Sequence, residues 1–214
     1  NRPIPSGKIS ANGAFLVAVG FAITGSILLF LTNPIMALIL SWLTLFFYNV
    51  VYTPLKKISA FAVIPGSMVG ALPPMIGWAG AGGSLSSEVI LLVAGFFFIG
   101  QIPHFWLLLM MFGDQYKLAG LPSLNQIFNE SQLKRITFTW VLTTVASALL
   151  VIFFVFTNKL LMFALLFYTF YLLSSLTMAV VVQKELKVRP AFLKLNLLYL
   201  FMMFFLIADA LFRA

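Results

Sequence analysis

The sequence predicts an all-α, polytopic membrane helix bundle, and three features of the chain support this fold class. Of the 214 residues, 62% are hydrophobic and 8% are charged, whereas a soluble domain is about half apolar and about a quarter charged. The apolar residues occur in runs of roughly 20, the length at which a helix crosses a bilayer. The chain has no cysteine, which excludes disulfides, thiolate metal sites and cysteine nucleophiles.

Seven runs approach this length, and we expect them to form one transmembrane domain covering residues 1–214. They lie at about residues 11–31, 34–52, 60–80, 88–112, 136–157, 160–182 and 194–212. The third run contains Pro65, Gly66 and the Pro73–Pro74 pair. Proline removes a backbone donor and glycine weakens a helix, so interruptions are expected there. The polar joint 113–135 is far longer than a helical hairpin needs, and such loops are usually functional or disordered.

Lysine and arginine predict the orientation of these spans. If the amino terminus is placed inside, alternating spans put eleven of the thirteen basic residues on the inner side and leave Lys159 and Arg213 outside. This asymmetry is what the positive-inside rule expects. We therefore attribute the net charge of +8 to membrane topology and expect no nucleic-acid partner. The amino-terminal segment, the Lys56–Lys57 turn and the joint 113–135 should meet at one cytoplasmic mouth of the bundle.

The residue types at this mouth suit a phosphorylated ligand held partly through a divalent ion. The cations are Arg2, Lys8, Lys56, Lys57 and Lys117, and Asp114 and Glu130 supply carboxylates. Basic side chains neutralise phosphate oxygens, and a carboxylate can anchor Mg²⁺ that bridges to them. The alternative is that these cations only set topology, since basic loops are common on the cytoplasmic face of membrane proteins.

Four residue strings resemble the UbiA superfamily of membrane prenyltransferases, and within it the branch that farnesylates haem. The strings are NRPIPSGKIS at 1–10, YTPLKK at 52–57, GSMVGALPPMIGW at 66–78, and PHFW at 103–106 followed by DQYKLAGLPSL at 114–124. Their order, spacing and predicted topology agree with the family over most of the chain. The ALPPMIGW and PHFW strings are typical of the haem branch.

The resemblance implies nine helices around a lipid-open cavity with its polar mouth on the cytoplasmic side of the bacterial inner membrane. It implies an enzyme that transfers the farnesyl group of farnesyl diphosphate to a vinyl group of haem b, giving haem O for haem A biosynthesis. Mg²⁺ is the implied cofactor. The implied partners are the two substrates, the lipid bilayer and a downstream haem A synthase.

Site residues follow from the same strings. Asp114, Tyr116 and Lys117 are expected at the catalytic centre, with Asp114 as the metal ligand. Arg2, Lys8, Lys56 and Lys57 are expected to bind diphosphate, although the lysines could be topology anchors. Asn49, Tyr52, His104 and Trp106 are assigned to the cavity for haem and the prenyl chain. Asn49 and Tyr52 are expected one helical turn apart on one face, yet an interfacial tyrosine is also a common anchor.

Two polar residues inside the predicted spans have plainer interpretations. His104 could contact haem iron, because neutral imidazole is a common iron ligand, or it could be a buried, hydrogen-bonded structural histidine. Asp209 is interpreted as an acid whose side chain reaches the outer surface near Arg213. An acid at the end of a span can also be functional, which is the alternative for Asp209.

The chain also departs from the family pattern. The first acidic motif of the family precedes the RPxPSG segment, so we expect an amino-terminally truncated chain that lacks two helices and that motif and is inactive alone. Gln115 and Ser123-Leu124-Asn125 also differ from the usual residues. The alternatives are a prenyltransferase with another aromatic acceptor, a membrane transporter, whose broken helices and polar centre would be similar, or a haem-delivery factor.

Overall fold

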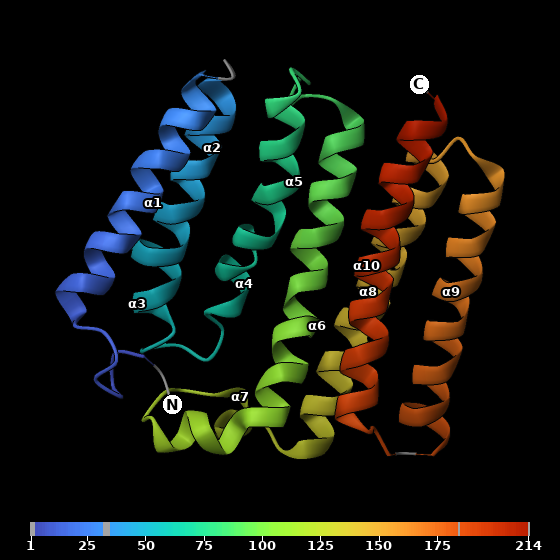
Figure 1. The fold of residues 1–214 in the computed structure, drawn as a ribbon. Helices are drawn as coiled ribbons and strands as arrows, with labels where there is room; N and C mark the ends of the chain where they lie inside the picture. The colour runs from blue at the N-terminus through green and yellow to red at the C-terminus, as the bar shows by residue number, and fades with distance from the viewer. Residues whose placement is uncertain (1–2, 32–34, 184, 214) are drawn as a thin grey trace.

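The structure is a computed structural model that describes residues 3–31, 35–183 and 185–213, and within these ranges it contains helices and turns but no strand. Figure 1 shows the helices side by side, most running between the same two ends of the bundle. In chain order the elements are α1 (Ala11–Leu31), α2 (Ile35–Phe46), the π-helix η1 (Phe47–Tyr52), α3 (Thr53–Leu55), α4 (Val63–Gly66), α5 (Met68–Gly80), α6 (Glu88–Leu118), α7 (Leu124–Ile127), α8 (Glu130–Val155), α9 (Lys159–Thr177), the π-helix η2 (Met178–Val182) and α10 (Val188–Arg213).

The all-α membrane bundle is confirmed, but the expectation of seven long spans is corrected. Six helical stretches in the described ranges are long and apolar enough to cross a membrane: 11–31, 35–55, 88–118, 130–155, 159–182 and 188–213. The run predicted at 60–80 forms two shorter helices, α4 and α5, which meet at Ser67. Pro65 and Pro73–Pro74 cannot donate backbone hydrogen bonds, which accounts for this weak helical segment. Together α4 and α5 still run between the two ends of the bundle (Figure 1).

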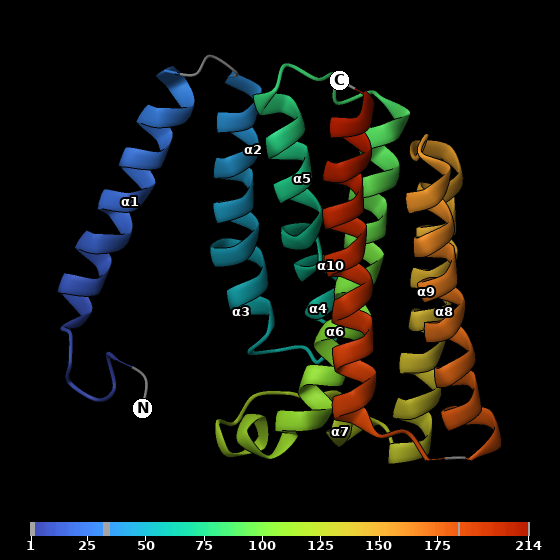
Figure 2. The ribbon, with the colours of Figure 1, turned by 45° about the vertical axis from the view of Figure 1, so that its right-hand side comes forward.

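Helix α6 is the centre of the arrangement, packing against α5, α8 and α10. On one side, α2 packs against α5; on the other, α9 packs against α8 and α10. Helix α1 lies at the edge, as Figure 2 shows, and buries none of its residues. The bundle therefore has a well-packed half made of α6, α8, α9 and α10 and a more open half that contains α1 and α2.

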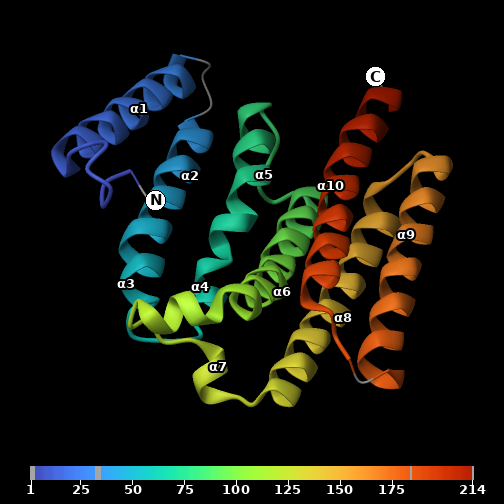
Figure 3. The same ribbon diagram turned by 60° about the horizontal axis from the view of Figure 1, so that its bottom comes forward.

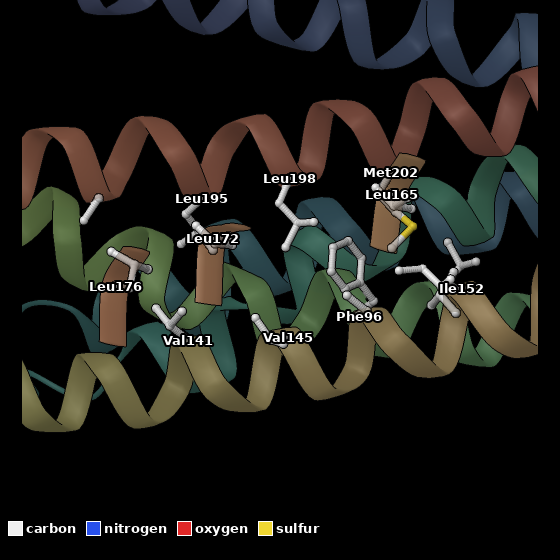
Figure 4. Packing of buried hydrophobic residues seen from close by; sticks show 14 of the residues in the cluster. Phe96, Val141, Val145, Ile152, Leu165, Leu172, Leu176, Leu195, Leu198 and Met202 are labelled. Carbon is white, nitrogen blue, oxygen red and sulfur yellow. The ribbon is translucent and has the colours of Figure 1, made fainter. Parts of the chain in front are cut away.

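Large aliphatic side chains fill the well-packed half. Figure 4 shows residues from α6, α8, α9 and α10 meeting along its axis; Phe96, Val145, Leu172, Leu198 and Met202 are among them. All five are at least 96% buried. Lipid is as apolar as these side chains, so close van der Waals packing holds such helices together more than hydrophobic burial does.

The polar joints gather at one end of the bundle, as the charge pattern predicted. The segment 3–10, the turn after α3, and the chain from the end of α6 through α7 all lie at the lower end in Figure 1. Helix α6 has a non-helical residue at Phe112 (φ −121°, ψ 17°). Beyond it the helix turns aside and runs toward α3, which Figure 3 shows from below. The kink thereby places residues 113–118 across the end of the bundle.

The opposite end contains a buried acid that the sequence interpretation described wrongly. Asp209 of α10 is 1% exposed and does not extend to the surface. Its carboxylate accepts hydrogen bonds from the backbone amides of Thr157 (3.1 Å) and Asn158 (2.6 Å), and from Arg213 Nε (2.9 Å). Arg213 also donates to the carbonyl of Val155. Asp209 thus ties the α8–α9 turn to α10 and satisfies amides that an apolar surrounding would leave unpaired.

Candidate functional site

The candidate site is built around Tyr52, the last residue of the π-helix η1. A π-helix has i→i+5 hydrogen bonds and occurs frequently at functional sites. Its turn is wider than that of an α-helix, so three residues fall well short of a full turn. The expectation that Asn49 and Tyr52 share a face is therefore wrong. Tyr52 is buried, whereas Asn49 is exposed and donates a hydrogen bond to the carbonyl of Leu45.

The Tyr52 ring lies directly against the backbone of Gly66. A Cβ atom on Gly66 would stand 2.6 Å from Tyr52 Cδ2, closer than packed atoms approach. Glycine at this position lets α4 and η1 come together and fixes the ring between them. Phe105 of α6 closes the other side, with ring centroids 6.1 Å apart.

Tyr52, Lys56 and Tyr116 line one small cavity at the polar end. Phe105, Leu109 and Pro122 complete part of its wall, and its volume is about 20 Å³. That is room for about one water molecule. The Lys56 ammonium lies 5.5 Å from the centre of the Tyr52 ring, a cation–π distance. The predicted meeting of the YTPLKK and DQYK strings is therefore realised through Lys56, Tyr52 and Tyr116.

The three residues predicted at the catalytic centre do not point the same way. Tyr116 is half-buried in the cavity wall, whereas Asp114 and Lys117 are exposed. Residues three apart lie on one face of a helix and residues two apart do not, which groups Asp114 with Lys117. Within the described residues, Asp114 makes no hydrogen bond or ion pair. Its carboxylate is thus available to a ligand.

Asn125 packs against the start of this segment. A Cβ on Gly113 would stand 2.4 Å from Asn125 Nδ2, so the glycine allows the side chain after the loop to lie on the helix just beyond the kink. The loop from α6 to α7 is thereby held close to Asp114. The sequence indicated a functional loop here but not this contact.

Lys8 and Lys57, two more of the predicted diphosphate residues, lie at the same end but outside the cavity wall. Lys8 is exposed, and its backbone amide donates to the carbonyl of Pro3. Lys57 is exposed and follows Lys56 in the turn after α3. Arg2 lies outside the described residues. Lys56 is accordingly the predicted diphosphate residue that the structure brings into contact with Tyr52.

His104 and Trp106 occupy two other faces of α6. His104 is half-buried against α10, where it packs with its ring centroid 5.0 Å from that of Phe192. Trp106 is 2% exposed and packs edge-on against Trp140 of α8, 5.9 Å between ring centroids. The indole Nε1 of Trp106 has no hydrogen-bond partner in the described residues. Neither residue lines the Tyr52 cavity, and their assignment to a substrate cavity remains a prediction.

Phe105 and Ser59 line the cavity but were not assigned to it from the sequence. Phe105 stands between His104 and Trp106 in the PHFW string, and Leu109, one helical turn later, lines the same wall. An i, i+4 pairing of these two residues was the available signal. Ser59 carried no comparable signal, since its position depends on how the turn after α3 folds back.

The acidic residues can be tested for a metal site. Among the described residues, no three His, Cys, Asp or Glu side chains gather. Glu130 is occupied by Lys134 at 2.6 Å, which leaves Asp114 as the unpaired carboxylate near the cavity end. Mg²⁺ is commonly held through one or two carboxylates together with substrate phosphates and water. A single free Asp114 fits that mode of binding and does not fit a site built from protein ligands alone.

The fold and this site define a class: a polytopic helical membrane protein with a basic, aromatic-lined polar end. The family model described as "UbiA prenyltransferase family" matches residues 1–207. The chain therefore belongs to the UbiA prenyltransferase family.

Curated relatives named "Protoheme IX farnesyltransferase" are similar to the chain. The relative from Geobacter sulfurreducens is 44% identical over 123 residues, which cover 56% of this chain and 44% of the relative. The one from Oleidesulfovibrio alaskensis is 40% identical over 122 residues, 57% of this chain and 43% of the relative. That from Trichormus variabilis is 35% identical over 153 residues, 71% of this chain and 48% of the relative. The matched region thus spans less than half the length of each of these relatives. No solved structure matches the chain.

Proposed function

We propose that the chain acts in transfer of a farnesyl group from farnesyl diphosphate to a vinyl group of haem b, giving haem O. The observation that carries this proposal is the similarity to relatives named protoheme IX farnesyltransferase, in a chain of the UbiA prenyltransferase family. The basic end that carries Lys56 and Asp114 would then be the cytoplasmic mouth in a bacterial inner membrane. A haem A synthase would be the downstream partner, because haem O would be its substrate.

The reaction requires a diphosphate to leave and a carbocation to survive. Breaking the allylic carbon–oxygen bond leaves the electron pair on diphosphate, and the farnesyl cation then forms a bond with the vinyl carbon of haem. Loss of a proton or capture of water completes the product. Cations aimed at the diphosphate oxygens stabilise the charge that develops on the leaving group, and an apolar surrounding keeps water from the cation until the new bond has formed.

Lys56 is the residue of this chain best placed for the first task. Tyr52 holds its ammonium at the cavity through the cation–π contact, and the neighbouring Tyr116 hydroxyl can donate to an anionic oxygen. Lys57, Lys117 and Lys8 add positive charge at the same end. Asp114 would hold Mg²⁺, which when bound neutralises diphosphate charge. Phe105 and Leu109 supply an apolar wall next to these groups.

The test is replacement of Asp114 by alanine in the full-length protein expressed in membranes, with haem O measured by pigment extraction and chromatography. Removing the metal-binding carboxylate should lower haem O formation by about 100-fold, the scale of losing one strong transition-state interaction. Glu185→Ala is the matched control, since Glu185 is an exposed acid shortly before α10, whose first turn lies at the same end of the bundle (Figure 1), and the variant should leave activity unchanged.

The proposal has two separate points of failure. Unchanged haem O in Asp114→Ala membranes, with equal protein by immunoblot, would remove Asp114 from the mechanism. Absence of haem O from membranes that contain the unaltered full-length protein, both substrates and Mg²⁺ would overturn the proposed reaction itself.

A further inference from the structure

A second groove at the polar end is separate from the Tyr52 cavity. It lies between the first turns of α8 and the π-helix η2, has a volume of about 510 Å³, and shares no lining residue with that cavity. Ser131, Lys134 and Arg135 contribute polar groups, and Phe138, Val181 and Leu186 are among the apolar ones. Nothing in the proposed transfer reaction uses this groove.

Its charge is carried mainly by Arg135. Lys134 is paired with Glu130 at 2.6 Å, so that pair contributes little net charge. Arg135 is exposed, and its guanidinium forms no ion pair with the described residues. The Thr139 hydroxyl donates to its backbone carbonyl (3.1 Å), and Arg135 itself lines the groove. The groove therefore presents one uncompensated planar cation, a good partner for a phosphate group.

Polar and apolar side chains both line the groove, with Thr139 among the polar ones. Arg135 lies five residues into α8, about 7.5 Å from its first residue at 1.5 Å per residue. Phe138 follows nearly one turn deeper. Across the groove, η2 presents Val181, which is 57% exposed, and Leu186 (8% exposed) closes the back. A basic side chain beside apolar ones in a groove between transmembrane helices is an arrangement that binds anionic lipid headgroups.

We propose that this groove binds an anionic phospholipid of the bilayer, with its phosphate on Arg135 and the upper part of an acyl chain against Phe138, Val181 and Leu186. Three features select a lipid over a soluble anion: the apolar part of the groove, its location at the end of a membrane span, and the single free cation. The bound lipid would fill the space between α8 and η2 and hold η2 in its wide turn. This inference is independent of the proposed transfer reaction.

The experiment uses the chain purified in detergent with equimolar dioleoyl phosphatidylglycerol or dioleoyl phosphatidylcholine, and bound lipid is counted by native mass spectrometry. Phosphatidylglycerol should be retained in preference to phosphatidylcholine. Arg135→Gln should reduce its retention about fivefold, as expected for one basic residue at an anionic surface. Val181→Trp should reduce it by filling the groove without changing charge.

Arg189→Gln is the matched control, because Arg189 is an exposed arginine at the same end that does not line the groove. Retention in this variant should equal that of the unaltered chain. The proposal is overturned if both lipids are retained equally, if Arg189→Gln loses as much lipid as Arg135→Gln, or if Val181→Trp retains it fully. Displacement of the lipid by 10-fold excess inorganic phosphate would instead identify a soluble-anion site and reject the lipid.

Discussion

Replacing Asp209 with alanine will lower the melting temperature of the detergent-solubilised chain by about 6–12 °C. Asp209 is buried, and its loss would leave the Thr157 and Asn158 amides and the Arg213 guanidinium without their acceptor. Breaking a buried pair costs about 3–5 kcal/mol; we use the lower figure because Arg213 is 44% exposed and solvent screens its charge. One kcal/mol corresponds to about 2–4 °C for a chain of this size. A loss of about 3 kcal/mol therefore lowers the melting temperature by about 6–12 °C.

Two further variants distinguish the loss of the Asp209 hydrogen bonds and ion pair from a general loss of negative charge. Asp209→Asn keeps an acceptor oxygen for the amides and should fall between alanine and the unaltered chain. Glu88→Ala removes an exposed acid at the start of α6, which lies at the same end of the bundle as the end of α10 (Figure 1). It should shift the melting temperature by less than about 4 °C, the limit set by a helix-terminal charge. Equal melting of the Asp209→Ala and Glu88→Ala chains would show that the contacts of Asp209 do not stabilise the bundle.

Under the proposed farnesyl transfer, replacing Gly66 with alanine will reduce haem O formation by about 10- to 100-fold in the full-length protein. The new Cβ would overlap the Tyr52 ring at 2.6 Å, and the ring cannot move aside cheaply because Phe105 lies behind it. Tyr52 would therefore shift and carry Lys56 with it. A displacement of about 1 Å in a positioning group can cost about 100-fold in rate, and overpacking costs about 1–3 kcal/mol of stability.

Gly77→Ala is the matched control for this substitution. A Cβ on Gly77 would meet nothing within 4 Å, and alanine favours a helix, so this variant should fold and react normally. Both variants are compared by haem O content per amount of folded protein. If Gly66→Ala behaves like Gly77→Ala, the Tyr52 position has no bearing on the reaction.

The long spans were predictable from the sequence because each has enough apolar residues to cross a bilayer and ends at polar joints. Basic residues alone predicted which joints share an end of the bundle. The details that place the site were not predictable in this way. The sequence placed the end of the fourth span at Phe112, just before Gly113, but did not show that α6 continues beyond the kink to Leu118. The π-helix η1 has the composition of an ordinary apolar helix. Both depend on packing between elements distant in sequence.

In the candidate site, too, some features were predictable from the sequence and others depend on packing. Strings around Tyr52, Lys56 and Tyr116 indicated the polar end correctly, because short motifs flanking apolar runs fix where their residues can lie. Which side of α6 faces the cavity depends on the rotation of that helix, so Phe105 was missed beside Trp106. Asp209 was misinterpreted for a related reason: its hydrogen-bond donors lie about fifty residues earlier in the chain, and no local pattern reveals them.

The wide turn of η1 also has a consequence for how much the chain length can vary here. A π-turn accommodates one residue more than an α-turn between the same two flanks. Deleting one exposed residue there, such as Val50, would let the segment close into regular α-helix while α2 and α3 keep their relative phase. The same deletion inside α2 would rotate everything that follows by about 100°. Phe47–Tyr52 is therefore where this helix can lose a residue without changing which faces meet.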